Sequence, residues 1–444
     1  MRAVADSSRE IRAVGLGLTP EEALAAWPAG EPLAVLWSGG GGAESRCTVL
    51  ARPSGVSGAV PGSAGEAKAF IEAELRAAGV ATGEGDIATK TSPWHPGPEF
   101  LGGVIFALAY PLGGMLEPAV GTSRHASTGP LIQAWRVEDA LIYDHHRSRW
   151  FAVGSPPTLA VGGFARGFRV AGLRAEGEAA GFEAGVERVL EYIRAGDVYQ
   201  VNLAHRLSAR IEGSTRGFFA ALMGAARPWY GAYLETETGT VCSASPELFL
   251  TYDPARRRLL TRPMKGTRPA GREGELAASE KDAAELNMIT DLMRNDIGRV
   301  SELGSVAVEQ TRSFERHNQL VQTTSTVTGT LRAGLSFVDA LLSAFPGGSV
   351  TGCPKVRAMQ IIDELEACGR GMYCGAIGYI SRSGHAAFNI AIRTAVIEGD
   401  QLTYHAGAGI VVDSDPAAEW QETLDKAGIL SRVASHNGET SPAP

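Results

Sequence analysis

Cysteine is scarce and unpaired in this chain of 444 residues. The five cysteines show no C-x-x-C spacing, and their number is odd: Cys47, Cys242, Cys353, Cys368 and Cys374. This pattern excludes a disulfide-rich secreted scaffold and favours reduced thiols. We therefore expect a cytosolic protein.

Long hydrophobic runs are also missing. The longest one, residues 101–115, is interrupted by four glycines and a proline, so it is too short and too broken to cross a bilayer. The first 11 residues carry four charged side chains and no apolar core, so no secretory signal peptide is predicted. A soluble protein in the cytoplasm, without a membrane partner, is the expectation.

Positive charge is in deficit. The chain has 41 Lys and Arg against 49 Asp and Glu, a formal net charge of −8, and no run of basic residues, which argues against a nucleic-acid partner. With 44% hydrophobic and 20% charged residues, it can bury a large core. An acidic enzyme that takes an anionic substrate would need local positive charge or a metal ion.

The texture of the sequence changes near residue 175. Residues 1–175 are rich in Gly, Ala and Pro, residues 176–435 have sharper hydrophobic periodicity, and residues 436–444 are polar and expected to be disordered. Strands and helices are mixed without strict alternation, which indicates an α+β fold with mostly antiparallel sheets.

Individual elements can be predicted in the second part. One helix ends at Gly196, a residue typical of helix C-termini. Further helices are predicted over 275–295, from Pro354 and over 416–433, and strands over 198–207, 374–381, 387–397 and 402–412.

Two pairs of acids lie on helix faces that are otherwise apolar. Asp282 and Glu285 are three residues apart, as are Glu419 and Glu422, and both pairs share a stripe with Leu and Ile. Carboxylates that face inward must be neutralised, either by Lys or Arg partners such as Lys426 or by a divalent cation. Oxygen ligands without nearby His or Cys suit Mg²⁺.

The predicted strand 387–397 carries Arg393 between two alanines, where a planar guanidinium would have space to bind a carboxylate. The alternative is an arginine that bridges to a local acid. Gly407 and Gly409 interrupt the next strand-like run, which is typical of a bulge or of close backbone approach to a ligand. Residues 345–355 lead into a helix whose free amides could bind an anion.

Six strings carry a resemblance to a known family. They run in order over more than half of the chain: Asp-Val-Tyr-Gln-Val-Asn-Leu (197–203), Ala-Ser-Pro-Glu-Leu-Phe (244–249), Arg-Pro-Met-Lys-Gly-Thr-Arg (262–268), Leu-Met-Arg-Asn-Asp-Ile-Gly-Arg (292–299), residues 345–357, and residues 409–426. Together they resemble the chorismate-utilising enzymes, which include anthranilate, aminodeoxychorismate, isochorismate and salicylate synthases.

The resemblance implies a four-layer α/β/β/α sandwich of mainly antiparallel sheets, with the active site between the sheets. It implies Mg²⁺ as cofactor. Glu285 and Glu422 match direct ligands of the ion, and Asp282 and Glu419 match acids that reach it through water. The matching chorismate-binding residues are Arg393, Tyr379, Gly407, Gly409, Gly266, Thr267 and Thr351, of which the first two would grip the enolpyruvyl carboxylate. Glu247 matches a general acid/base that helps the C4 hydroxyl leave, although a Glu after a proline is by itself typical of a solvated turn.

Three positions indicate the reaction. Gln200 stands where members that add water carry Lys, and its neutral amide indicates ammonia as the nucleophile. Lys265 stands where anthranilate synthases carry Ala and resembles the aminodeoxychorismate synthases; a buried lysine can attack C2 of chorismate, whereas a surface lysine in a turn could not. Gln322 replaces a family His, which agrees with a product that keeps its enolpyruvyl group.

The resemblance thus implies amination of chorismate to 4-amino-4-deoxychorismate in 4-aminobenzoate and folate biosynthesis. No Gly-Cys-Gly nucleophile elbow occurs in the chain, so a glutamine amidotransferase partner is expected to supply ammonia. The nearest alternative is an anthranilate synthase component I. A non-catalytic subunit that only binds chorismate or tryptophan is a third reading, against which Glu247, Glu285, Glu422 and Lys265 speak.

Overall fold

The computed structural model describes residues 11–39, 46–81, 99–121, 123–125, 129–160, 162–164, 166–317 and 320–436. Its strands are β1 (Arg12–Val14), β2 (Ala34–Trp37), β3 (Cys47–Ala59), β4 (Gly103–Leu108), β5 (Ile132–Asp144), β6 (Arg149–Val153), β7 (Phe168–Ala175), β8 (Gln200–Gly213), β9 (Tyr230–Glu235), β10 (Thr240–Ser245), β11 (Leu248–Asp253), β12 (Arg258–Arg262), β13 (Met264–Pro269), β14 (Ala307–His317), β15 (Leu320–Thr330), β16 (Gly352–Cys353), β17 (Ala376–Ser381), β18 (Ala386–Ile390), β19 (Thr394–Glu398) and β20 (Gln401–Ile410).

Its helices are α1 (Pro20–Ala25), α2 (Ala64–Ala77), α4 (Leu112–Leu116), α5 (Ala179–Ala195), α6 (Thr215–Ala226), α7 (Glu273–Ala278), α8 (Glu280–Gly298), α9 (Phe337–Ala344), α10 (Lys355–Leu365) and α11 (Pro416–His436), with 3-10 turns η2 (Pro118–Val120) and η3 (Gly348–Val350). The predicted disordered tail, 436–444, lies outside the described residues except for His436.

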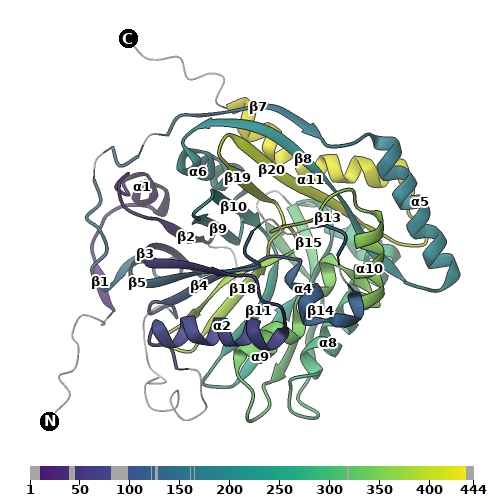
Figure 1. The fold of residues 1–444 in the computed structure, drawn as a ribbon, viewed down its shortest axis with the longest axis horizontal. Helices are drawn as coiled ribbons and strands as arrows, with labels where there is room; N and C mark the ends of the chain where they lie inside the picture. Colours follow the sequence, from purple (N-terminus) through teal and green to yellow (C-terminus); the bar gives the residue numbers. More distant parts are fainter. Residues whose placement is uncertain are drawn as a thin grey trace.

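The strands form a layered sandwich between helices. The strand pairings recorded for the described residues are all antiparallel. Figure 1 shows the strands between α5, α6 and α11 on one side and α2, α8 and α9 on the other. Helix α11 packs on β20 and α5, whereas α8 packs on β15 and α9. The α+β class and the predicted antiparallel sandwich are confirmed.

The two parts predicted from the sequence share this sheet. Strand β2 pairs with β9, and β4 pairs with β17, so residues before and after 175 contribute to the same ladders. Apolar clusters on the sheet faces also draw on both parts. The boundary at residue 175 stays a prediction.

One predicted strand is interrupted. The single strand predicted over 387–397 is wrong, because β18 ends at Ile390 and β19 begins at Thr394. Between them Arg393 has a left-handed backbone with a φ of 51°, which turns the chain. The Arg393 carbonyl accepts a hydrogen bond from the amide of Ala244 at 2.9 Å. The predicted position of Arg393 depended on the alternation of side chains along one continuous strand. Because the chain turns at Arg393, this alternation does not apply to it.

One predicted helix is two helices. Helix α7 ends at Ala278 and α8 begins at Glu280, where a continuous helix was predicted over 275–295. Ser279 separates them with an extended backbone, and its side chain accepts a hydrogen bond from the Asp282 amide. This N-cap starts the helix that carries the first acid pair.

The glycine-containing strand has no bulge. Strand β20 pairs with β8 residue for residue from Gln401 to Ile410. The glycines therefore do not mark a bulge. They allow other groups to approach the backbone closely, since a Cβ atom at either one would lie less than 3 Å from another side chain.

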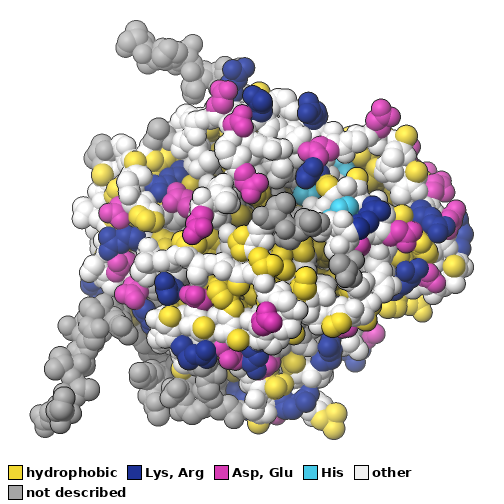
Figure 2. Space-filling model, viewed as in Figure 1, with side chains coloured by type: hydrophobic (Ala, Val, Ile, Leu, Met, Phe, Trp, Pro, Cys, Tyr) yellow, Lys and Arg dark blue, Asp and Glu magenta, His cyan; other side chains and the backbone are white. Residues whose placement is uncertain are grey.

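Charges of both signs are spread over the surface. On the face viewed in Figure 2, Lys and Arg side chains are interspersed with Asp and Glu. Among the described residues, no helix is both long and apolar enough to cross a membrane.

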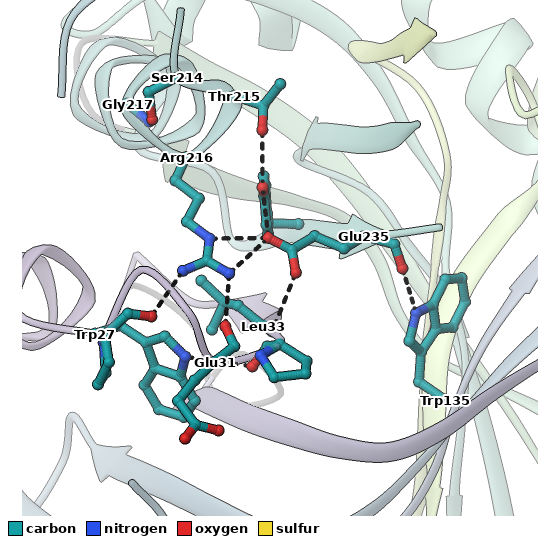
Figure 3. A network of polar contacts seen from close by, with 12 residues as sticks. Trp27, Glu31, Leu33, Trp135, Ser214, Thr215, Arg216, Gly217 and Glu235 are labelled. Carbon is teal, nitrogen blue, oxygen red and sulfur yellow. Dashed lines mark hydrogen bonds and ion pairs between the residues drawn. The ribbon is translucent and has the colours of Figure 1, made fainter. Parts of the chain in front are cut away.

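A polar network ties the N-terminal segment to the sheet (Figure 3). Arg216 on α6 donates to Glu235 Oε1 at 2.8 Å and to the carbonyls of Pro28 and Glu31 at 3.1 and 2.7 Å. The other carboxylate oxygen of Glu235 accepts from the Leu33 amide at 3.0 Å. One buried arginine thus holds two carbonyls of the chain that leads into β2.

Arg216→Met should lower the free energy of unfolding by about 2–4 kcal/mol, because it removes the cationic partner of Glu235 and the donor to two carbonyls. Chemical denaturation of the variant and of the wild type, purified in parallel, measures the loss. Arg210→Met is the matched control: Arg210 and Asp400 form a pair at 3.6 Å with side chains 81% and 65% exposed, which should contribute less than about 0.5 kcal/mol. Equal losses in the two variants would contradict the assignment.

Candidate active site

Lys265 lies where a strand, a helix and a glycine meet. Strand β13 is irregular beside it, since Gly266 has a φ of 66° and the register with β15 shifts between Lys265 and Thr267. The Nζ atom lies 3.5 Å from Glu285 Oε2 of α8. A Cβ atom on Gly409 of β20 would lie 3.3 Å from the same Nζ. The Lys265 side chain is 16% exposed, so the alternative of a surface lysine is wrong.

Gln200 lies beside this lysine on β8. A Cβ atom on Gly409 would lie 2.5 Å from Gln200 Nε2, so only glycine leaves room for the amide. The Gln200 side chain is buried, and its Oε1 atom has no hydrogen-bond partner among the described residues; the same holds for Asn202 Nδ2 two positions along the strand. Unpaired buried polar atoms are costly, so their presence indicates that a polar ligand binds here.

Glu247 is buried in the turn between β10 and β11, and a solvated turn acid is therefore wrong. Its side chain is 5% exposed and hydrogen-bonds with Ser349. Burial raises the pKa of Glu247 to about 7, although Ser349, Lys265, Lys426 and Arg393 each lower it. A carboxyl with this pKa can donate and accept a proton near neutral pH.

Each of the four predicted ligand acids meets a cation. The ion pairs recorded in the structure are Glu285 with Lys265 at 3.5 Å, Asp282 with Arg268 at 3.1 Å, Glu419 with Lys281 at 4.0 Å, and Glu422 with Lys426 at 2.7 Å. The ion-pair reading of the sequence therefore describes this structure. Lys265 is also among the charges that lower the pKa of Glu422. Glu285 and Glu422, the two predicted direct ligands, therefore interact with the same lysine.

The two acids of α11 differ in exposure. Glu419 is buried and accepts a hydrogen bond from Ser414 Oγ at 2.6 Å, whereas the Glu422 side chain is 53% exposed. The prediction that Glu422 faces the interior is wrong, because it lies at the edge of the apolar stripe. Partial burial would raise the pKa of Glu422, but Lys426 lowers it and the net shift is downward. Burial raises the pKa of Glu419.

The donors suit a hard cation, although they do not form a closed cage. Among the residues that the structure describes, no group of three or more His, Cys, Asp or Glu side chains is placed to hold a metal ion. Magnesium, however, binds through one or two carboxylates and keeps several waters. Glu285 and Glu422 provide such oxygens, and the exposure of Glu422 leaves space for water. The chemistry of these residues fits Mg²⁺.

Arg393 belongs to the same site, but Tyr379 does not join it. Burial lowers the pKa of Arg393, and Glu247 and Tyr404 are among the groups whose charges act on it. Tyr379 packs on Phe100 with ring centroids 5.2 Å apart and lines a separate pocket.

Tyr373 is the tyrosine found beside Gly407. A Cβ atom on Gly407 would lie 2.6 Å from the Tyr373 hydroxyl. Burial raises the pKa of that hydroxyl, and the Asn202 side chain is among the groups that lower it. The pairing of Arg393 with Tyr379 is therefore not found.

The remaining predicted residues line the same region. Gly266 has no room for a side chain, because a Cβ atom would lie 2.9 Å from Asp282 Cγ. The Thr267 hydroxyl accepts a hydrogen bond from Gln322 Nε2 at 3.0 Å. Thr351 is buried, and its carbonyl accepts from the Asn202 amide at 2.8 Å.

Sequence reasoning missed three side chains of this site: Tyr373, Asn202 and Ser349. No periodicity or spacing distinguishes them, because each reaches the site through strand pairing or a loop. Lys426 was considered only as a neutralising partner. It donates to the Gly407 carbonyl at 2.8 Å as well as to Glu422, so it joins α11 to the glycine strand.

Comparisons with known proteins agree on one family. The sequence profile described as "chorismate binding enzyme" matches residues 35–432. Aminodeoxychorismate synthase component 1 of Klebsiella aerogenes is 39% identical over 364 residues, 77% of this chain and 79% of that protein. Anthranilate synthase component 1 of Aquifex aeolicus is 43% identical over 260 residues, 57% of this chain and 52% of that protein.

Solved structures of relatives have the same fold. Anthranilate synthase component I from Streptococcus pneumoniae superimposes with a TM-score of 0.69 at 26% identity and covers 96% of this chain and 93% of that one. A menaquinone-specific isochorismate synthase from Escherichia coli superimposes with a TM-score of 0.68 at 18% identity, a likeness of fold alone.

Glu247→Gln should stabilise the protein at alkaline pH. Because the folded-state pKa of Glu247 is raised from 4.5 to about 7, its contribution to stability is present below pH 4.5 and is lost as the pH rises through about 7. The glutamine side chain of the variant does not ionise, so the variant does not lose this stability. The variant should gain about 1–3 kcal/mol over the wild type at about pH 8 and little at about pH 4. Denaturant midpoints at the two pH values measure this, and a pH-independent difference would contradict the buried acid.

Proposed function

Because the chain belongs to the family of chorismate binding enzymes, we propose that it aminates chorismate with ammonia to give 4-amino-4-deoxychorismate. The coarser conclusion, an enzyme that converts chorismate, follows from family membership. The observation that carries the finer one is the position of Lys265, a largely enclosed amine 3.5 Å from Glu285 whose charge also acts on the raised pKa of Glu247. A lysine and a neutral carboxyl are the two groups that a covalent amination requires.

The proposed reaction has two displacements. The ammonium of Lys265 first gives a proton to solvent. Its amine then attacks C2 of the ring, the double bond shifts, and the C4 hydroxyl leaves as water with the proton of Glu247. Ammonia then attacks C4, the double bond shifts back, and the C2–nitrogen bond breaks to release Lys265. The proton lost by the new amine returns to Glu247, so chorismate and ammonia give the amine and water.

Gln200 supports ammonia rather than water as the nucleophile. An amide side chain cannot take a proton from water, as a general base must. Its unpaired Oε1 atom can accept a hydrogen bond from ammonia and orient the lone pair. Tyr373 precedes β17 and Arg393 follows β18, so both flank the open end of this hairpin. They are proposed to bind the enolpyruvyl carboxylate.

Magnesium is proposed as the cofactor. Glu285 and Glu422 would hold it directly, and Asp282 and Glu419 would orient its waters. The bound ion would supply positive charge to the ring carboxylate of chorismate. Lys265 and Lys426 must then exchange their carboxylate partners for other contacts, and Lys426 already has one in the Gly407 carbonyl.

The ammonia is proposed to come from a glutamine amidotransferase subunit. Several relatives are named component 1, which supports a second component. The product would serve 4-aminobenzoate and folate biosynthesis. An anthranilate synthase component I is the second candidate, because relatives with that name are as similar. Lys265 and Gln322 favour the first, since the second has no use for a lysine nucleophile.

Chorismate, ammonium salt and Mg²⁺ should yield a product without release of pyruvate. A pyridoxal-phosphate-dependent lyase added afterwards should release pyruvate and 4-aminobenzoate together, as chromatography can follow. Lys265→Ala should slow the reaction roughly a hundredfold or more. Lys265→Arg keeps the charge without the nucleophile and should be equally slow. Anthranilate fluorescence with pyruvate before the lyase is added would sink the proposal and promote the second candidate.

Removal of the metal should abolish turnover reversibly. A chelator should stop the reaction and Mg²⁺ should restore it, because the proposed ion supplies the positive charge that binds the ring carboxylate beside four acids. Glu285→Ala and Glu422→Ala should each lose activity and calorimetric Mg²⁺ binding. Asp425→Ala, an exposed acid of α11, is the control and should keep both. Near-normal activity in either site variant at ordinary Mg²⁺ would refute the ligand assignment.

A further inference from the structure

The most deeply buried ion pair described lies outside the groups that carry the proposed reaction. Glu366 follows the last residue of α10, and Arg370 lies four residues further, beyond the helix. Their side chains are 4% and 1% exposed. Arg370 donates through Nε to Glu366 Oε2 at 2.9 Å and through Nη2 to Oε1 at 2.6 Å. Burial would lower the pKa of Arg370, but Glu366 raises it well above its usual value. The guanidinium is therefore permanently charged.

The pair takes the place of a missing neighbour strand. One edge of β8 pairs with β16 at Gln200 and Val201, and with β7 only from Leu207 onward. Between these stretches, Glu366 Oε1 accepts from the Ala204 amide at 2.9 Å and Arg370 donates to the Asn202 carbonyl at 2.5 Å. Side chains thus satisfy the edge of β8 where no strand does.

The same guanidinium reaches a loop and a tyrosine of the site. Arg370 Nη1 donates to the Val350 carbonyl at 2.9 Å, next to Thr351. Its charge lies 5.6 Å from the centre of the Tyr373 ring. One side chain therefore contacts three separate segments that surround the substrate region.

The residues held by the pair are the partners of the two site glycines. In the β8–β20 ladder, Asn202 is opposite Gly409 and Ala204 is opposite Gly407. Asn202 also donates its backbone amide to the Thr351 carbonyl, and its side chain is among the groups that act on the pKa of Tyr373. A small shift of β8 at this point would move Gln200, the glycines and Tyr373 together.

We propose that Glu366 and Arg370 are positioning residues that hold β8 in the register and depth at which the Gly407–Gly409 strand binds chorismate. The inference rests on the proposed role of these glycines in substrate binding. Neither side chain touches the reacting atoms; both act through Asn202, Ala204 and Val350. Loss of the Arg370 guanidinium should therefore weaken chorismate binding in protein that is still folded.

Arg370→Lys is the decisive variant, because it keeps the charge and the partner Glu366 but cannot reach all three acceptors. Chorismate binding is measured by calorimetry without ammonia, so that no turnover occurs. We expect the Kd to rise at least tenfold, and KM with it, since displacements of about 1 Å have effects of this size. The unfolding midpoint is measured on the same samples.

Arg216→Lys is the matched control. Arg216 also binds a glutamate and two backbone carbonyls, but at the junction of α6 with the N-terminal segment. It should lose stability with an unchanged Kd. Glu366→Gln, which keeps an acceptor for Ala204, should give an intermediate Kd.

A folded Arg370→Lys protein that binds chorismate as tightly as the wild type overturns the proposal. Equal changes of Kd in Arg370→Lys and Arg216→Lys would also overturn it, as would failure of both Arg370→Lys and Glu366→Gln to fold, which would assign the pair to stability alone. Because binding is measured without ammonia, a wild-type enzyme that makes a different product would refute the proposed amination and leave this comparison intact.

Discussion

The pairing of β8 with β20 is the constraint on which the candidate site depends. Ten consecutive residue pairs run without a bulge, so the two glycines of β20 are set opposite Asn202 and Ala204. Because neither glycine has a Cβ atom, Gln200, Lys265 and Tyr373 can lie against the strand. The ladder thus brings together polar side chains from segments far apart in the sequence, and a side chain at either glycine would collide with them.

Local charge follows from this arrangement. An acidic protein gathers Lys265, Lys426 and Arg393 around Glu247, and their charges oppose the effect of burial on its pKa. Burial has the larger effect, and the carboxyl remains able to carry a proton near neutrality. The local positive charge expected for an anionic substrate is therefore present, and the same groups adjust the one acid that the proposed chemistry needs.

The four acids of α8 and α11 reconcile the two readings of their sequence pattern. In this structure each meets a lysine or an arginine. Three of those cations sit on flexible stems, so a divalent ion could take their place without rearranging a helix. If the proposed magnesium binds, ion pairs and metal ligation would be successive states of one set of carboxylates, since either partner removes the cost of leaving them unpaired.

The sequence by itself determined the fold class, the helices that correspond to α5, α8, α10 and α11, and the presence of the four acids on two of them, because hydrophobic period and capping residues act over a few neighbours. It also gave the family, through strings that are each contiguous. It did not predict α6 or α9. Nor did it predict that Tyr373, and not Tyr379, lies at the site, or that the Glu422 side chain is exposed. It also did not predict the turn at Arg393. Those outcomes depend on which strands pair and where the chain leaves a ladder. Only the tertiary structure decided them, because a contact between residues far apart in sequence is set by the packing of the whole sandwich.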